Sequence, residues 1–230
     1  MQAQEVHEPK TGRRKFLQLI GAAGAISGML SFSGTSVAAH KHVRAQTSGW
    51  TQKTSQTAAA LRDLWVGHIF WVRTVSVAAF GKNAAAMQAA ERQAVANAES
   101  LAAAIEPFYG APAKASFFKL LAAHYGAVKT YLQAAVEDNV AAQETATQSL
   151  SSNAEEIAIF LSKANPHLAK DAVHGLLLAH GGHHIQQIQQ LKAHEYDAEA
   201  KTWQDMKNHV YAIADATAAA LSKQFASRFR

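Results

Sequence analysis

A five-residue segment occurs three times in this chain of 230 residues, each time 56 residues after the last. The copies at 64–68, 120–124 and 176–180 all begin with leucine and end with histidine. Asn97 and Asn153 keep the same spacing, and the third copy has His209 at that position. A repeat of this length is typical of a duplicated supersecondary unit. We therefore expect three tandem helical hairpins, each with a histidine near the middle of its first helix.

Apolar residues recur at helical spacing through six stretches of the sequence. Abundant alanine, only four prolines and 8% aromatic residues also favour packed helices over sheet. Asn83 and either Asp138 or Asn139 are suitable N-caps, and Pro112 suits a first helical turn. The expected helices lie at about 54–80, 83–107, 112–136, 139–162, 167–193 and 197–225. With short connections, they form an all-α, up-down bundle of about six helices.

The first forty residues are expected to lie outside this bundle. Residues 10–18 resemble a twin-arginine export signal, since Arg13 and Arg14 are followed by Phe-Leu and a moderately apolar run. We expect a signal peptide at 1–39, a flexible leader at 40–52 and the bundle domain at 53–230. Cleavage after Ala38 or Ala39 would release a periplasmic protein with no stable membrane insertion. The expected partner in export is the twin-arginine machinery.

Composition excludes several classes of function. The chain has no cysteine, so it has neither disulfides nor thiolate metal ligands. Removal of residues 1–39 takes away four basic and two acidic residues, which lowers the net charge from +5 to +3. That charge is too small to predict nucleic-acid binding. No glycine-rich phosphate loop, dinucleotide fingerprint or Ser-His-Asp arrangement is present.

The three repeated histidines, His68, His124 and His180, lie on the apolar faces of their predicted helices. Because each stands near its helix midpoint, the three side chains can share one layer of the bundle. A neutral imidazole has one donor and one acceptor, and both need partners when the ring is buried. A transition metal ion satisfies several imidazole lone pairs at once. Zinc, iron, copper and nickel all accept such ligands.

Further candidates surround this layer. His184 lies one turn after His180 on the same helical face, and Glu156 could act as a ligand, a base or a support for a histidine. Asn97 and Asn153 could hydrogen-bond to the histidine rings from the second helix of each hairpin. The alternative for Glu156 is an exposed or lysine-paired carboxylate. For the asparagines it is ordinary hydrogen bonding between helices.

Several motifs together are specific to one group of proteins. They are Leu64-Trp65-x-x-His68-x-x-Trp71-x-Arg73, Leu120-Leu121-x-x-His124, Asn153-Ala154-x-Glu156-Ile157-Ala158-x-Phe160-Leu161 and Asn165-Pro166. In these motifs the sequence resembles an uncharacterised bacterial family of exported helical proteins, whose members often carry enzyme names such as acetylglutamate kinase. The resemblance covers nearly all of residues 61–229 and implies a helical fold, but the sequence shows nothing that a kinase would need. A second segment, 180–188, is similar to the last helix of the DinB/YfiT-like bundles. That similarity implies a metal site with His180, His184 and His68 as ligands.

Three functions remain open from the sequence. The first is an exported metal-binding helical bundle with a buried histidine layer. The second is a non-catalytic binding or interaction module in which the histidines only pack the core. The third is a metal-dependent hydrolase or redox enzyme, whose substrate and catalytic residues the sequence does not identify. Arg73, Arg92 and Asp215 are expected on a solvated face, with half-buried ion pairs as the alternative.

Overall fold

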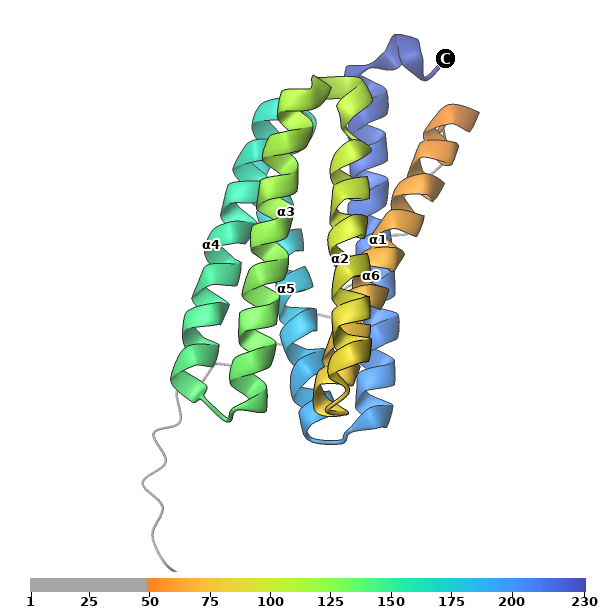
Figure 1. The fold of residues 1–230 in the computed structure, drawn as a ribbon. Coiled ribbons are helices and arrows are strands. Elements are labelled where there is room, and N and C mark those ends of the chain that lie inside the picture. Colours follow the sequence, from red (N-terminus) through yellow and green to blue (C-terminus); the bar gives the residue numbers. More distant parts are fainter. Residues whose placement is uncertain (1–48) are drawn as a thin grey trace, which may run out of the picture. The chain divides into compact units, whose positions relative to one another are not determined.

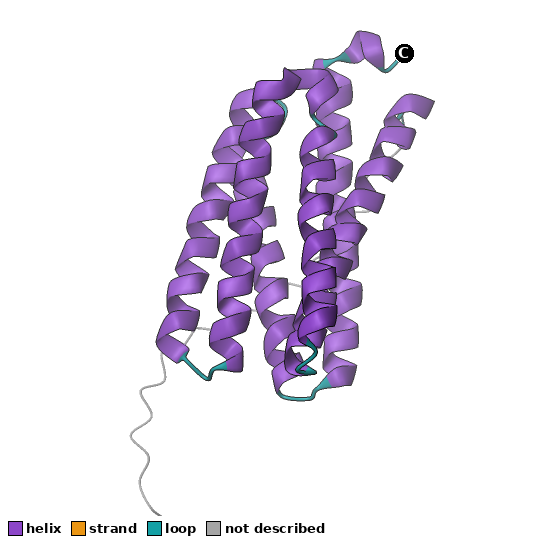
Figure 2. Cartoon of the chain, in the orientation of Figure 1, coloured by secondary structure: helices purple, strands orange, loops and turns teal. Residues whose placement is uncertain are grey.

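A computed structural model of the protein describes residues 49–230. Over that range the fold is all-helical and contains no strand, which confirms the predicted α-helical bundle (Figures 1 and 2). Its elements are α1 (Gln52–Phe80), α2 (Ala84–Ala103), α3 (Glu106–Val136), α4 (Val140–Ala164), α5 (Lys170–Lys192), α6 (Tyr196–Gln224) and a short terminal 3-10 helix, η1 (Ala226–Arg228).

The six helices form a closed ring in which each contacts its neighbours in sequence. Successive helices run in opposite directions, and the ring closes where α6 packs beside α1 (Figure 1). The helices α1, α3 and α5 also contact one another, whereas no contacts are made among α2, α4 and α6. The first helix of every hairpin therefore lines the interior of the bundle, and the second helix packs outside it.

Side-chain caps start the first helix of the bundle and the second helices of two hairpins. The Thr51 hydroxyl accepts a hydrogen bond from the Thr54 amide, and the Asn83 and Asn139 side chains accept one from the amides of Ala86 and Ala142. Asn83 and Asn139 are among the predicted caps. Helix α1 begins at Gln52, slightly earlier than expected, and so includes the last residue of the predicted leader.

The turn between the first two hairpins differs from the prediction in one detail. Helix α2 ends at Ala103, and the Pro107–Gly110 segment belongs to the start of α3 rather than to the end of α2. Gly110 has φ 81° and ψ 172°, which interrupts α3 after its first turn. An L-residue with a side chain rarely adopts that conformation, so glycine is needed there. Pro112 then lies in the first turn of the long part of α3.

The three hairpin turns repeat the same backbone geometry. Lys82, Asp138 and His194 stand 56 residues apart, and each has a left-handed φ between 54° and 58°. A left-handed conformation costs a non-glycine residue about 1–2 kcal/mol. Three residues at equivalent positions would not all adopt it unless the turns were built in the same way. This recurrence shows that the sequence repeat is also a structural repeat.

Two apolar clusters fill the core on either side of the histidines. Along α1, residues such as Leu61 and Trp65 precede His68 and belong to the larger cluster, whereas Val72 and Val75 follow it and belong to the smaller one. The same order holds along α3 and α5. The histidine layer is thus a polar level enclosed by hydrocarbon above and below.

Within residues 49–230, no helix has the length and hydrophobicity required to cross a membrane. The predicted signal peptide at 1–39 and most of the predicted leader at 40–52 lie outside the described residues.

Candidate functional site

Four histidines meet in the centre of the bundle. His68 comes from α1, His124 from α3, and His180 and His184 from successive turns of α5. All four are at most 5% exposed. One nitrogen from each ring lies within 4.8 Å of the corresponding nitrogens of the others. Three parallel inner helices therefore bring together side chains that are up to 116 residues apart in sequence.

The Nε2 atom of His180 is the centre of this cluster. It lies 3.3 Å from His68 Nε2 and 3.2 Å from His184 Nε2. A neutral imidazole nitrogen has either one hydrogen or one lone pair in the ring plane. His180 Nε2 can therefore make a proper hydrogen bond to one of these two neighbours but not to both. Hydrogen bonding alone leaves the cluster incompletely satisfied.

Asn153 on α4 determines the tautomer of His124. Its Nδ2 donates to the Leu120 carbonyl at 3.1 Å, so its Oδ1 is the atom that faces His124 Nδ1, at 3.2 Å. An amide oxygen only accepts, and His124 must therefore carry its hydrogen on Nδ1. The Nε2 lone pair is then free, and this atom is buried without a hydrogen-bond partner. This arrangement agrees with the predicted supporting role of Asn153.

The other two hairpins repeat the contact to the inner helix, and in the third hairpin the His209 ring also stacks on the His180 ring, with centroids 6.4 Å apart. Asn97 Nδ2 donates to the Leu64 carbonyl at 3.0 Å, and His209 Nε2 lies 2.8 Å from the Leu176 carbonyl. Each contact spans 33 residues, as does the one from Asn153 to Leu120. The predicted contact of Asn97 with a histidine ring is not observed, and its Oδ1 is buried without a partner.

All four rings are uncharged at neutral pH. Burial lowers the pKa of His68 to about 3, and the nearby His124 ring adds to the effect. Burial lowers the pKa of His124 to about 4, although its hydrogen bond with Asn153 acts in the opposite direction. Burial and the neighbouring rings hold the pKa values of His180 and His184 well below the usual 6.5. The lone pairs needed to bind a metal are thus present without prior loss of a proton.

Glu156 lies away from this cluster. It is exposed on α4, whereas Asn153 and Ile157 on the same helix are buried. A carboxylate on the solvent side of an outer helix does not reach a layer enclosed by the three inner helices. The structure therefore brings together His68, His124, His180 and His184 but leaves out Glu156.

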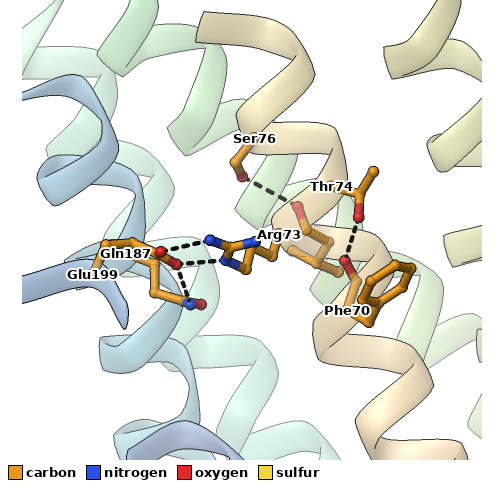
Figure 3. Close-up of polar contacts among 7 residues, drawn as sticks. Phe70, Arg73, Thr74, Ser76, Gln187 and Glu199 are labelled. Atoms are coloured by element: carbon orange, nitrogen blue, oxygen red, sulfur yellow. Dashed lines mark hydrogen bonds and ion pairs between the residues drawn. The ribbon is translucent and has the colours of Figure 1, made fainter. Parts of the chain in front are cut away.

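A buried ion-pair network, drawn in Figure 3, lies within about one and a half helical turns of the cluster along the chain. Arg73 of α1 donates from Nε and Nη2 to both carboxylate oxygens of Glu199 on α6, at 2.6 and 2.7 Å. Gln187 of α5 donates to the same carboxylate at 2.9 Å. Glu199 is 1% exposed, so these donors replace the water that it loses. The network joins α1, α5 and α6 three residues after His184 and five after His68.

A second ion pair also joins α1 to α6. Arg62 donates to both carboxylate oxygens of Asp215 at 2.7 and 2.6 Å, and Asp215 is 6% exposed. The expected solvated positions of Arg73 and Asp215 are thus wrong, and the alternative of half-buried pairs is correct. Arg92 is exposed, as expected. The partners Glu199 and Arg62 carry no local motif, and only their tertiary contacts identify them.

The chain was compared with family models, with curated proteins and with solved structures. No family model, no curated protein and no solved structure matches the chain. The resemblances noted in the sequence stay predictions, and the site has to be interpreted from its own geometry.

Acid should destabilise the metal-free protein. Each buried histidine has a lower pKa when folded than the ordinary 6.5 of the unfolded chain, so below pH 6.5 the unfolded state binds more protons. The free energy of unfolding should fall from about pH 6 toward pH 4, by up to about 1.4 kcal/mol per pH unit for each histidine. Denaturant titrations of chelator-treated protein measure this slope. His184→Leu should reduce this pH slope by about the contribution of one histidine.

Equal slopes for His184→Leu and the parent protein would contradict the neutral, buried state of the cluster.

Loss of Arg73 should be costly because it leaves Glu199 buried without its main partner. We expect Arg73→Leu to lower the free energy of unfolding by about 3 kcal/mol. Glu199→Gln in the same background should recover part of this loss, since the buried group is then uncharged. Denaturant unfolding of both single variants and the double variant gives the coupling energy. A coupling near zero would show that the pair does not stabilise the fold.

Proposed function

We propose that this protein is an exported metal-binding protein in which His68, His124, His180 and His184 hold one transition metal ion. The observation that carries the proposal is the pair of Nε2 contacts at His180, 3.3 and 3.2 Å long. Imidazole nitrogens around a tetrahedral zinc ion, each about 2.0–2.1 Å from it, lie about 3.3 Å apart. These two distances are those expected between ligands of one metal ion.

A bound ion resolves the contacts that hydrogen bonds leave unsatisfied. It accepts the lone pairs of His68, His180 and His184 together, so no Nε2 atom has to face another without a hydrogen between them. It also gives a partner to the buried Nε2 of His124. The Nδ1 atom of His180, which is buried without a partner as well, is not accounted for in this way. The widest nitrogen separation, up to 4.8 Å, requires rings to draw together by up to about 1.5 Å to reach the spacing of tetrahedral ligands.

The support for His124 is of the kind found around metal sites. A ligating histidine usually donates its other ring nitrogen to a carbonyl or carboxylate, which sets its tautomer and orientation. Asn153 Oδ1 takes that role for His124. An all-imidazole set suits zinc, copper, iron or nickel, and it does not suit magnesium or calcium, which prefer oxygen ligands.

The main alternative is a binding module in which the four histidines are only core residues. In that case the layer fixes the packing of the helices, and the protein has no use for metal. The two functions differ in what the purified protein contains and in how it responds to a chelator. A metal that binds only in the folded state raises the melting temperature, whereas chelation has no effect on a metal-free core.

Metal content is the first measurement. Elemental mass spectrometry on untagged protein, purified without chelator, should find about one equivalent of a transition metal. His180→Leu should remove nearly all of it, because His180 contacts two of the other ligands. His167→Leu, at an exposed position, should keep it. Less than a tenth of an equivalent in the parent protein, before and after incubation with zinc, iron, copper or nickel salts, would falsify the proposed function.

Export is the second part of the proposal and rests on the segment that resembles a twin-arginine signal. Replacing Arg13 and Arg14 together by lysine should retain the precursor in the cytoplasm, because paired arginines are the feature by which such signals are known. Cell fractionation and immunoblotting measure the distribution. Lys10→Arg is the control, since it keeps the charge and the arginine pair. Equal export of the lysine pair would show that another route is used.

A further inference from the structure

An apolar cavity of about 60 Å³ adjoins the histidine cluster. His68, His124 and His180 form part of its wall, whereas His184 does not line it. The cavity extends along the bundle through the larger apolar cluster, and every helix contributes to it. One lining residue from each helix in turn is Leu61, Leu101, Leu121, Ile157, Leu177 and Ile213.

The wall offers very few groups to a polar occupant. Apart from the three histidines, its polar side chains are Trp65 and Thr217, and the Thr217 hydroxyl already donates to the Ile213 carbonyl at 2.8 Å. A buried water needs two to four polar partners, and cavities lined by hydrocarbon stay dry. An apolar cavity of about 150 Å³ binds benzene or xenon. A volume of about 60 Å³ therefore fits a molecule of two to four non-hydrogen atoms.

We propose that this cavity binds a small, uncharged, apolar molecule of about the size of dioxygen, next to the histidine cluster. Its position beside a metal ion rests on the proposed function, whereas the cavity itself does not. Among the lining residues, Ala216 on α6 is exposed, and Leu161, Leu168, Leu176 and Thr217 are half-buried. The other lining residues are buried.

The cavity lies on one side of the histidine cluster and so distinguishes one face of the proposed metal site from the others. Because three of the four histidines line it, an ion held by all four turns the face formed by His68, His124 and His180 toward the cavity. A molecule in the cavity would approach the ion from the side of these three histidines. A catalytic metal site keeps a position open to a small molecule. A structural site, by contrast, has no need of an open space at one face.

Xenon is a suitable probe because it is uncharged, polarizable and of the right size. Under xenon pressure, methyl NMR spectra of the protein should show saturable shifts at Leu61, Leu121 and Leu177, which line the cavity. Leu132, Leu150 and Leu191 are equally buried but do not line it, and their methyl groups should not move. Absence of saturable shifts, or shifts of the same size in both sets, would overturn the proposal.

Two variants with opposite expected effects on xenon binding keep the test informative even if one of them misfolds. Val173→Phe should fill the cavity and weaken xenon binding at least tenfold, with the Leu132 and Leu150 methyl shifts as evidence that the fold is intact. Leu177→Ala should enlarge the cavity and strengthen binding. If both folded variants bind xenon as the parent protein does, the probe is elsewhere and the proposal is wrong.

The same samples separate this inference from the proposed function. Xenon shifts are measured on chelator-treated protein, and metal content is measured independently by elemental analysis. Metal without xenon binding overturns the cavity proposal alone, and saturable xenon binding without metal supports the cavity while contradicting the metal site. Cobalt(II)-loaded protein should relax bound ¹²⁹Xe faster than zinc(II)-loaded protein does. Equal relaxation would show that the cavity occupant is not beside the ion.

Discussion

Four imidazole rings lie between two apolar clusters of the bundle, where protein groups have to replace water as hydrogen-bond partners. This constraint explains why the inner helices meet where they do. It also explains why Asn153 reaches from an outer helix to His124, and why burial keeps all four rings neutral. The two apolar clusters supply the hydrophobic stabilisation, but they exclude water from the histidines at the same time. Packing and chemistry are therefore coupled at this level.

The duplicated hairpin accounts for the architecture but not for the whole site. Three copies give three inner helices, three equivalent turns and three equivalent contacts across 33 residues. His184 breaks this symmetry, because the equivalent positions of the other two copies are Val72 and Val128. The outer-helix residues differ as well, since His209 stands where the other copies have asparagine. A symmetric scaffold thus carries an asymmetric centre, with four rings on one side and a cavity on the other.

Much of this arrangement could be predicted from the sequence because it depends on periodicity. The repeat placed His68, His124 and His180 at one level, and the helical spacing of His184 added the fourth ring. Periodicity was too coarse for Glu156, which lies about 60° around α4 from Asn153 on the side away from Ile157. Arg73 and Glu199 are 126 residues apart, and the pair does not recur in the other hairpins, so the sequence pattern does not identify Glu199 as the partner of Arg73. The cavity depends on how six side-chain surfaces fit together, which spacing does not describe.

The distribution of the four histidines along the chain also bears on the kinetics of the site. Its four histidines come from three hairpins, so the inner helices must be assembled before all four rings can act together. An ion bound among them would be surrounded by the inner helices and, outside these, by the outer helices. It would leave most readily when one hairpin moves away from the other two. Exchange of the ion would then be as slow as that opening, and residence time would report on the cooperativity of the whole bundle.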